Sequence, residues 1–187
     1  MRAFIGVMAV LLFGGCITTL QKAEVLSEGE NAVTVVYGVP FFGEVSLRRG
    51  IGWNSDVTIK AALMVSPIPE WYILPMVSGE LKYQILSAPN PALAFILGGG
   101  AVEGGQGETV RITKFAYPTL LASYGRLYLG ARYIFDEEAP PGGSPLRGGV
   151  VGLALGPYKG FTVLTEVNIH TSQQTGVLVF AVLGVQR

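Results

Sequence analysis

From Asn31 onward the chain runs in segments of about ten residues in which polar and apolar side chains alternate, and Gly, Pro, Asn or Asp separates one segment from the next. Successive side chains of a β-strand point to opposite faces, so a period of two predicts strands, and no segment carries a sustained helical apolar stripe. We expect ten strands, at residues 31–39, 43–50, 54–65, 76–87, 91–102, 110–123, 126–136, 147–156, 161–170 and 176–186. Strands of about this length cross a bilayer when they are tilted. The pattern predicts an all-β fold, an antiparallel up-and-down transmembrane β-barrel of about ten strands.

Composition agrees with this prediction. The 187 residues are enough for one domain; half of them are hydrophobic and 14% are charged, against about 25% in an average soluble protein. After residue 15 no stretch reaches the roughly 18 apolar residues of a spanning helix, so strands would have to cross the bilayer. Thirteen basic residues balance thirteen acidic ones, which disfavours nucleic acid as a partner.

Most predicted strands have one polar and one apolar face. A barrel in lipid needs the apolar face outside and the polar face inside, the reverse of a soluble barrel such as a lipocalin. The inward charges are expected to form a lumen charge network: Glu44, Arg48, Asp56, Lys60, Glu80, Lys82, Arg126, Arg132 and Glu166. Four acids and five bases are nearly balanced, which leaves two interpretations open. Either the charges pair and fill a narrow barrel, or they line a solvated conduit.

The connections between predicted strands differ in length. Those after the second, fourth, sixth and eighth strands are tight, at residues 50–53, 88–91, 124–125 and 157–160, and longer ones follow the third, fifth and seventh, at 66–75, 103–109 and 137–146. Short periplasmic turns opposite longer extracellular loops are typical of outer-membrane barrels. Two girdles of aromatic residues are expected: Trp53, Tyr124, Tyr158 and Phe161 at the short turns, and Phe41, Phe42, Trp71, Tyr72 and Phe135 at the longer loops. An even strand number returns both termini to the periplasm.

The first fifteen residues have the layout of a secretory signal, with Arg2, an apolar run over residues 3–13, and two glycines. Gly14-Gly15-Cys16 resembles the lipobox of bacterial lipoproteins, in which the cysteine becomes the lipidated N-terminus. The resemblance implies lipidation of Cys16, and Ile17 after it implies the outer membrane. An ordinary secretory signal with an idle thiol is the alternative. We therefore expect a signal peptide at 1–15, a lipidated tether without chemistry of its own at 16–30, and a barrel at 31–187.

Four segments resemble a group of small, largely uncharacterised outer-membrane β-barrel proteins of Gram-negative bacteria, many with a lipobox. They are residues 22–30 (A-x-x-L-x-x-G), 49–57 (a strand–turn–strand), 81–86 (LKYQIL) and 117–121 (YPTLL). The group brings no catalytic residues to transfer. The resemblance implies membrane lipid and the outer-membrane assembly machinery as partners, with the protein as a monomer.

Chemistry in the sequence is sparse. One Cys and one His exclude an internal disulfide and a multi-histidine metal site, and the glycines at 98–100 and 104–105 lack the helix and Lys of a phosphate loop, so no metal and no cofactor are expected. His170 and Ser172, with Glu137 and Glu138 near the same rim, are the only residues that suggest a lipid hydrolase.

We expect a lipid-anchored outer-membrane barrel with a structural or small-solute role and no catalysis. Two alternatives stay open. One is a periplasmic lipid-anchored soluble β-barrel that binds an apolar ligand, and the other is an outer-membrane lipid hydrolase.

Overall fold

The computed structural model describes residues 18–39, 42–66, 72–87, 90–106, 109–137, 146–172 and 176–187. The predicted signal peptide, Cys16, Phe41, Trp71 and Glu138 lie outside these residues. The described residues form ten strands: β1 (Asn31–Val39), β2 (Phe42–Gly52), β3 (Ser55–Ser66), β4 (Tyr72–Leu86), β5 (Ala92–Gln106), β6 (Thr109–Tyr124), β7 (Leu127–Asp136), β8 (Leu146–Tyr158), β9 (Phe161–Ser172) and β10 (Gly176–Gln186).

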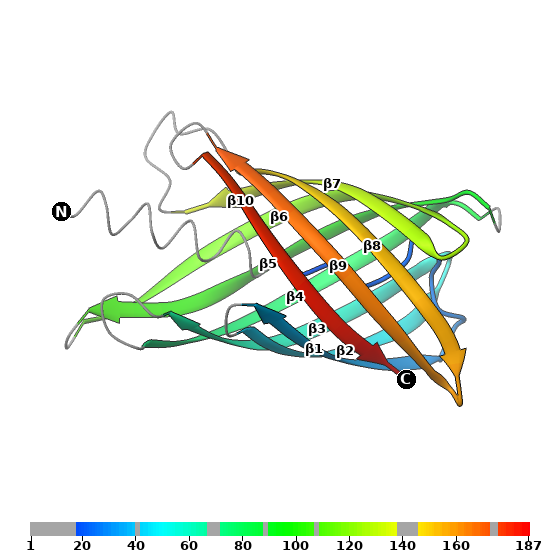
Figure 1. The fold of residues 1–187 in the computed structure, drawn as a ribbon, viewed down its shortest axis with the longest axis horizontal. Helices are drawn as coiled ribbons and strands as arrows, with labels where there is room; N and C mark the ends of the chain where they lie inside the picture. The colour runs from blue at the N-terminus through cyan, green and yellow to red at the C-terminus, as the bar shows by residue number, and fades with distance from the viewer. Residues whose placement is uncertain are drawn as a thin grey trace.

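The ten strands form one closed barrel (Figure 1). Each strand pairs antiparallel with the next, and β1 closes the barrel on β10 in a register that runs from Thr34 opposite Gln186 to Val39 opposite Ala181. The predicted all-β, up-and-down antiparallel architecture is therefore confirmed. Closure gives every strand two neighbours, so no sheet edge is left to pair with another chain.

Several strands are longer than the alternation predicts. β4 begins at Tyr72 rather than at residue 76, and its first residues pair with β3, where Leu63 lies opposite Pro75. The pairing of β4 with β5 starts only at Met76, so Pro75 stands where a proline is tolerated as on an edge strand. The prediction of a loop at residues 103–109 is also wrong. Gly104 and Gly105 pair with β6, so β5 continues to Gln106 and β6 begins at Thr109.

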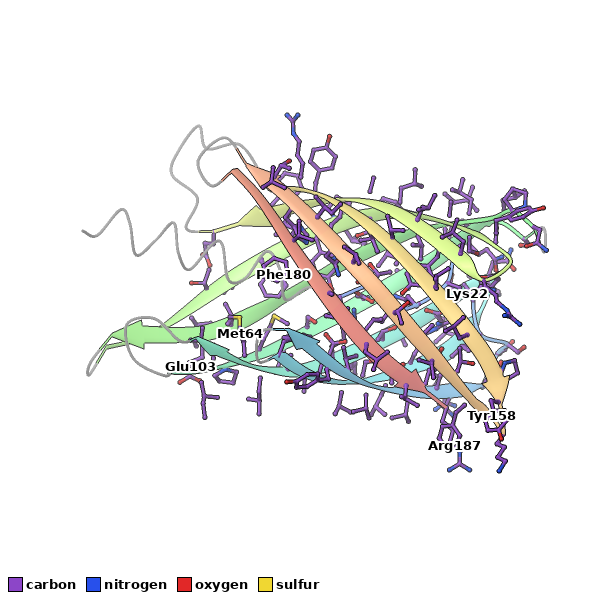
Figure 2. All side chains as sticks on the ribbon, in the orientation of Figure 1. Lys22, Met64, Glu103, Tyr158, Phe180 and Arg187 are labelled. Atoms are coloured by element: carbon purple, nitrogen blue, oxygen red, sulfur yellow. The ribbon has the colours of Figure 1, made fainter. Side chains whose placement is uncertain are left out.

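The two ends of the barrel differ. The β2–β3, β4–β5, β6–β7 and β8–β9 turns share one end with the C-terminus, which we call the short-turn end, and the remaining connections lie at the opposite, long-loop end. Tyr158 and Arg187 mark the short-turn end in Figure 2, and Met64 and Glu103 lie toward the other. Trp53 and Asn54 both have positive φ, as a two-residue type I′ hairpin turn requires.

The outer surface of the barrel is apolar. Side chains such as Ile59, Val77 and Val179 are at least 60% exposed on outward faces, while the residues on either side of Ile59 and of Val77 in the sequence are buried. Tyr124 and Tyr158 are exposed at the short-turn end. Phe42 departs from the expected girdle, because it takes the inward register of β2 and is buried.

Large inward side chains occupy space that glycines leave free on the neighbouring strand. Tyr117 lies over Gly98, where a Cβ would stand 2.3 Å from the ring, and Tyr128 lies over Gly152, where it would stand 2.0 Å from the ring. The ring of Tyr128 is fixed in place, because its hydroxyl donates a hydrogen bond of 3.2 Å to the carbonyl of Thr165. The barrel interior is therefore packed rather than open along these strands.

This packing predicts that Gly152→Ala destabilises the folded barrel by about 1–3 kcal/mol, because the new methyl group overlaps a ring that cannot turn away. Gly149→Ala on the same strand is the matched control, since its Cβ would meet only the carbonyl of Gly130 at 4.0 Å. Urea unfolding in detergent micelles measures both. Equal stability of the two variants would contradict the assigned inward register of β8.

Candidate functional site

Eight of the nine charges expected in the lumen lie there. Glu44, Arg48, Asp56, Lys60, Glu80, Lys82, Arg132 and Glu166 are all buried on inward faces. Arg48 and Lys82 both pair with one carboxylate oxygen of Asp56, at 2.9 and 3.1 Å, and Lys60 pairs with Glu80 at 2.7 Å. Mutual pairing therefore accounts for part of the network.

Arg126 is the exception, and its assignment to the lumen is wrong. β7 begins at Leu127, one residue after the predicted start, so Arg126 belongs to the β6–β7 turn and its side chain is exposed. Its carbonyl accepts a hydrogen bond of 2.8 Å from the amide of Ala154. The inward positions of β7 are instead Tyr128, Arg132 and Ile134.

The N-terminal segment lies inside the barrel. We call residues 18–26 the lumenal segment; its first residues, from Thr18 to Gln21, and Ala23 are buried, and it can be followed in Figure 1 as the dark blue trace within the barrel. The sequence indicated a tether without chemistry here. The structure instead gives nearly every residue of this segment a polar partner on the barrel wall.

The beginning of the lumenal segment is held at the middle of the barrel. The carboxylate of Glu166 accepts hydrogen bonds from two consecutive amides, Thr19 at 2.9 Å and Leu20 at 2.7 Å. The hydroxyl of Thr18 donates to Glu44 at 2.9 Å, and its carbonyl accepts from Lys60 at 2.5 Å. Arg132 donates to the hydroxyl of Thr19.

Lys82 donates hydrogen bonds to the next part of the lumenal segment. Its ammonium donates to the carbonyls of Lys22 at 3.2 Å and Glu24 at 2.8 Å, and to the side-chain oxygen of Gln21 at 3.2 Å. Arg48 donates to the same Glu24 carbonyl at 2.9 Å. Buried cations that pair with Asp56 are thus also satisfied by the main chain of the segment.

The side chain of Glu24 extends this contact to β6. Its carboxylate accepts a hydrogen bond of 2.8 Å from Ser123 and pairs with Lys22 at 2.8 Å. Burial alone would raise the pKa of Glu24, but these hydrogen bonds outweigh burial and hold the pKa below its usual value. Glu24 is therefore a carboxylate at neutral pH.

The segment leaves the lumen at the short-turn end and reverses into β1. Gly29 donates its amide to the carbonyl of Gly50 at 2.9 Å, and Gly50 donates to Glu30 at 3.0 Å. A Cβ at Gly50 would stand 2.0 Å from the carbonyl oxygen of Ser27, so only glycine allows this approach. From Thr18 to Gly29 the chain therefore runs from mid-barrel toward the short turns.

The half of the lumen nearer the long loops is mostly apolar. Inward apolar side chains described there are Phe42, Met64, Met76, Val102, Phe115 and Ile134, and Thr113 and His170 are buried polar side chains of the same half. His170 is enclosed next to the ring of Phe180, at 6.4 Å between centroids, and within the described part of the chain neither of its ring nitrogens has a hydrogen-bond partner. Glu137 lies exposed with its carboxylate 3.8 Å from Lys114, and no described carboxylate accepts a hydrogen bond from His170 to orient it.

No cluster of three or more His, Cys, Asp or Glu among the described residues could hold a metal ion. Nor does any helix in this part of the chain have the length and apolar character needed to cross a membrane.

No family model matches the sequence, and no curated protein is significantly similar to it. A solved structure, the N-terminal β-barrel domain of OprF from Pseudomonas aeruginosa, aligns with 86% of this chain and 98% of its own at 8% sequence identity and a TM-score of 0.43. At this TM-score and sequence identity the similarity says nothing about function. The assignment of the fold is based on the strand pairing described above.

The contacts of Glu166 predict how firmly the lumenal segment is seated. Glu166→Ala leaves the amides of Thr19 and Leu20 without their acceptor, which should weaken seating by about 1–3 kcal/mol, or roughly 5- to 150-fold. In a Cys16→Ser background, the cysteine of Thr19→Cys, which is buried and close in size to the side chain it replaces, should react slowly with a water-soluble maleimide, and faster by that factor once Glu166 is replaced.

A cysteine at exposed Ser27 is the control and should react fast with or without Glu166. If the cysteine at position 19 reacts as fast as the one at position 27 while Glu166 is present, the segment does not occupy the lumen.

Proposed function

We propose that this protein is an outer-membrane β-barrel of structural role that carries a lipid on Cys16. We also propose that paired charges close its lumen, together with its own lumenal segment as long as the lipid is not inserted at the short-turn end. One observation carries the membrane part of this proposal. The surface that faces outward is apolar over most of the barrel, while the enclosed surface carries eight charged side chains. Water would favour the opposite arrangement, and lipid favours this one.

The contacts inside the barrel support a closed lumen. Ten strands enclose little more space than the eight-stranded barrels that side chains fill, and here a peptide segment shares that space with Tyr117, Tyr128 and Arg132. A solvated conduit of porin type is the less favoured interpretation. We also propose that the protein is a monomer without catalytic activity. We propose further that the outer-membrane assembly machinery inserts it into the membrane.

The lumenal segment restricts where a lipid on Cys16 could go. Thr18 is held by Glu44 and Lys60 at mid-barrel, and the chain needs eight further residues to reach Leu26, whose amide lies 3.3 Å from Asp56 near the short turns. Cys16 precedes Thr18 by only two residues, a reach of about 7 Å. A lipid on Cys16 could therefore enter the leaflet at the short-turn end only when the segment leaves the lumen.

The membrane location is tested by Leu81→Arg. Leu81 points outward near the middle of β4, so in lipid vesicles the arginine should lower folding stability by about 2–4 kcal/mol. Ile51→Arg, at the short-turn rim, is the matched control and should cost about 0–1 kcal/mol. Equal tolerance of both substitutions would favour a soluble barrel with a lipid anchor.

Lipidation has its own test. Mass spectrometry of the mature protein should show a chain that begins at a lipid-modified Cys16, and Cys16→Ser should stay in the detergent-requiring outer-membrane fraction because the barrel itself holds it there. An unmodified thiol, or an intact apolar run over residues 3–13, would rule out the lipoprotein assignment.

Closure predicts the electrical behaviour. In planar bilayers the purified protein should show no stable steps of the size formed by porins with 16–18 strands. Lys82→Ala should destabilise the barrel or open a weak leak, since Asp56 and the carbonyls of the segment lose a buried cation. Large channels in the wild type that this substitution leaves unchanged would identify a diffusion pore.

A further inference from the structure

We propose that the lumen is a binding site for a polypeptide segment without regular secondary structure, that it recognises the main chain of that segment, and that the lumenal segment is its occupant in cis. A barrel freed of this segment then binds a separate peptide of the same kind. This goes beyond a closed structural barrel, because it assigns the lumen a class of ligand. It holds whether the barrel sits in a membrane or in a micelle.

Three main-chain carbonyls of the lumenal segment accept hydrogen bonds from cationic side chains of the barrel wall. Lys60 donates to Thr18, Lys82 donates to Lys22 and Glu24, and Arg48 shares the carbonyl of Glu24. These four hydrogen bonds do not depend on which side chains the segment carries.

Four main-chain amides of the lumenal segment donate hydrogen bonds to side-chain oxygens of the barrel wall. Glu166 takes the two consecutive amides of Thr19 and Leu20, Gln84 takes Val25 at 3.3 Å, and Asp56 takes Leu26 at 3.3 Å. Donors and acceptors thus both follow the path of the lumenal segment, which bends at Gln21 and Ala23 and has a positive φ at Leu20. A wall of this kind matches the alternating polarity of a peptide backbone.

The charge distribution argues against other polar ligands. Lys60, Glu80 and Glu166 meet the segment at the same part of the lumen, and Asp56 lies between Lys82 and Arg48 farther down. A polyanion would meet carboxylates at both places, and a polycation would meet ammonium and guanidinium groups. A neutral backbone that carries both donors and acceptors fits the two signs at once.

Side chains of the occupant set a second, smaller requirement. Ala23 is fully buried, and the Cδ1 atom of Leu20 would stand 3.3 Å from a Cβ at Gly184, so little room exists for larger groups at these two places. Thr18, Thr19 and Gln21 add side-chain hydrogen bonds to Glu44, Arg132 and Glu80. The expected ligand is a stretch of about nine residues that can adopt the irregular path of the lumenal segment, with a small residue at the sixth position.

The covalent link explains why such a site would be occupied in the intact protein. A tethered segment competes at an effective concentration in the millimolar range, so a free peptide at micromolar concentration cannot displace it. The site becomes measurable when the segment is replaced.

The experiment uses the full chain with residues 18–26 replaced by a Gly-Ser stretch of equal length, folded in detergent micelles. A fluorescent synthetic peptide with the sequence of residues 18–26 is titrated and its anisotropy measured. We expect saturable binding to this variant and none to the wild type. Absence of binding to a variant that circular dichroism shows to be a folded barrel would overturn the proposal, as would equal binding to the wild type.

Two peptides separate main-chain from side-chain recognition. N-methylation at Thr19 and Leu20 removes the two amides that Glu166 accepts and should weaken binding about tenfold or more. Replacement of Thr18, Thr19 and Gln21 by Ala keeps every main-chain group and should cost less than the methylated peptide does. The reverse order would overturn the main-chain assignment.

Two further wall variants locate the site. Lys82→Ala, combined with the Gly-Ser replacement, should weaken binding about tenfold, because it removes donors to two carbonyls. Lys114→Ala on the outer face of β6 is the charge-matched control and should leave binding unchanged. An equal loss in both variants would place binding outside the lumen. Because every arm is measured in micelles, a negative result here leaves the membrane location of the barrel untouched.

Discussion

The partnering of charges enclosed by the barrel wall is the constraint on which the rest of this structure depends. Closure of ten strands leaves one face of each strand inside, and here that face carries eight charged side chains. Buried charges are costly unless each finds an opposite charge or a hydrogen bond. Three ion pairs among wall residues satisfy only part of this requirement. The lumenal segment supplies the remaining groups: two amides to Glu166, carbonyls to Lys60, Lys82 and Arg48, and side chains to Glu44 and Glu80.

The same constraint explains the distribution of glycine along β5 and β8. A barrel that must hold a peptide as well as Tyr117 and Tyr128 has no room for a second layer of side chains beside those rings. Gly98 and Gly152 leave that room, and the hydroxyl of Tyr117 can then reach Glu80 at 2.8 Å. Gly98 therefore leaves space for the ring of Tyr117, and the packed ring places its hydroxyl where the buried carboxylate of Glu80 needs a hydrogen-bond donor.

The architecture could be predicted from the sequence because closure turns a period of two directly into inside and outside. Thr58, Lys60 and their outward neighbours show this in β3. The errors arose where that period carries no information. Arg126 lies in a turn, one residue before β7 begins, and Phe42 is the first residue of β2. Residues 18–26 have no periodicity at all, and their partners come from β2, β3, β4, β6, β7 and β9, so only the folded barrel brings them together. The signal available in sequence was indirect: a narrow lumen with more inward charges than wall pairs to satisfy them.

Seating of the segment and insertion of a lipid at the short-turn end exclude each other, and this has a consequence for assembly. A lipidated N-terminus that enters the membrane first would hold residues 18–26 away from the lumen while the strands close. Glu166, Lys82 and Glu44 would then be enclosed without their peptide partners, and water would have to solvate them. A segment that is already extended along the forming wall avoids this state, since its main chain satisfies both signs of charge as β1 closes on β10. If Cys16 is lipidated as proposed, the order in which chain and lipid reach the barrel therefore decides between a closed and a solvated lumen.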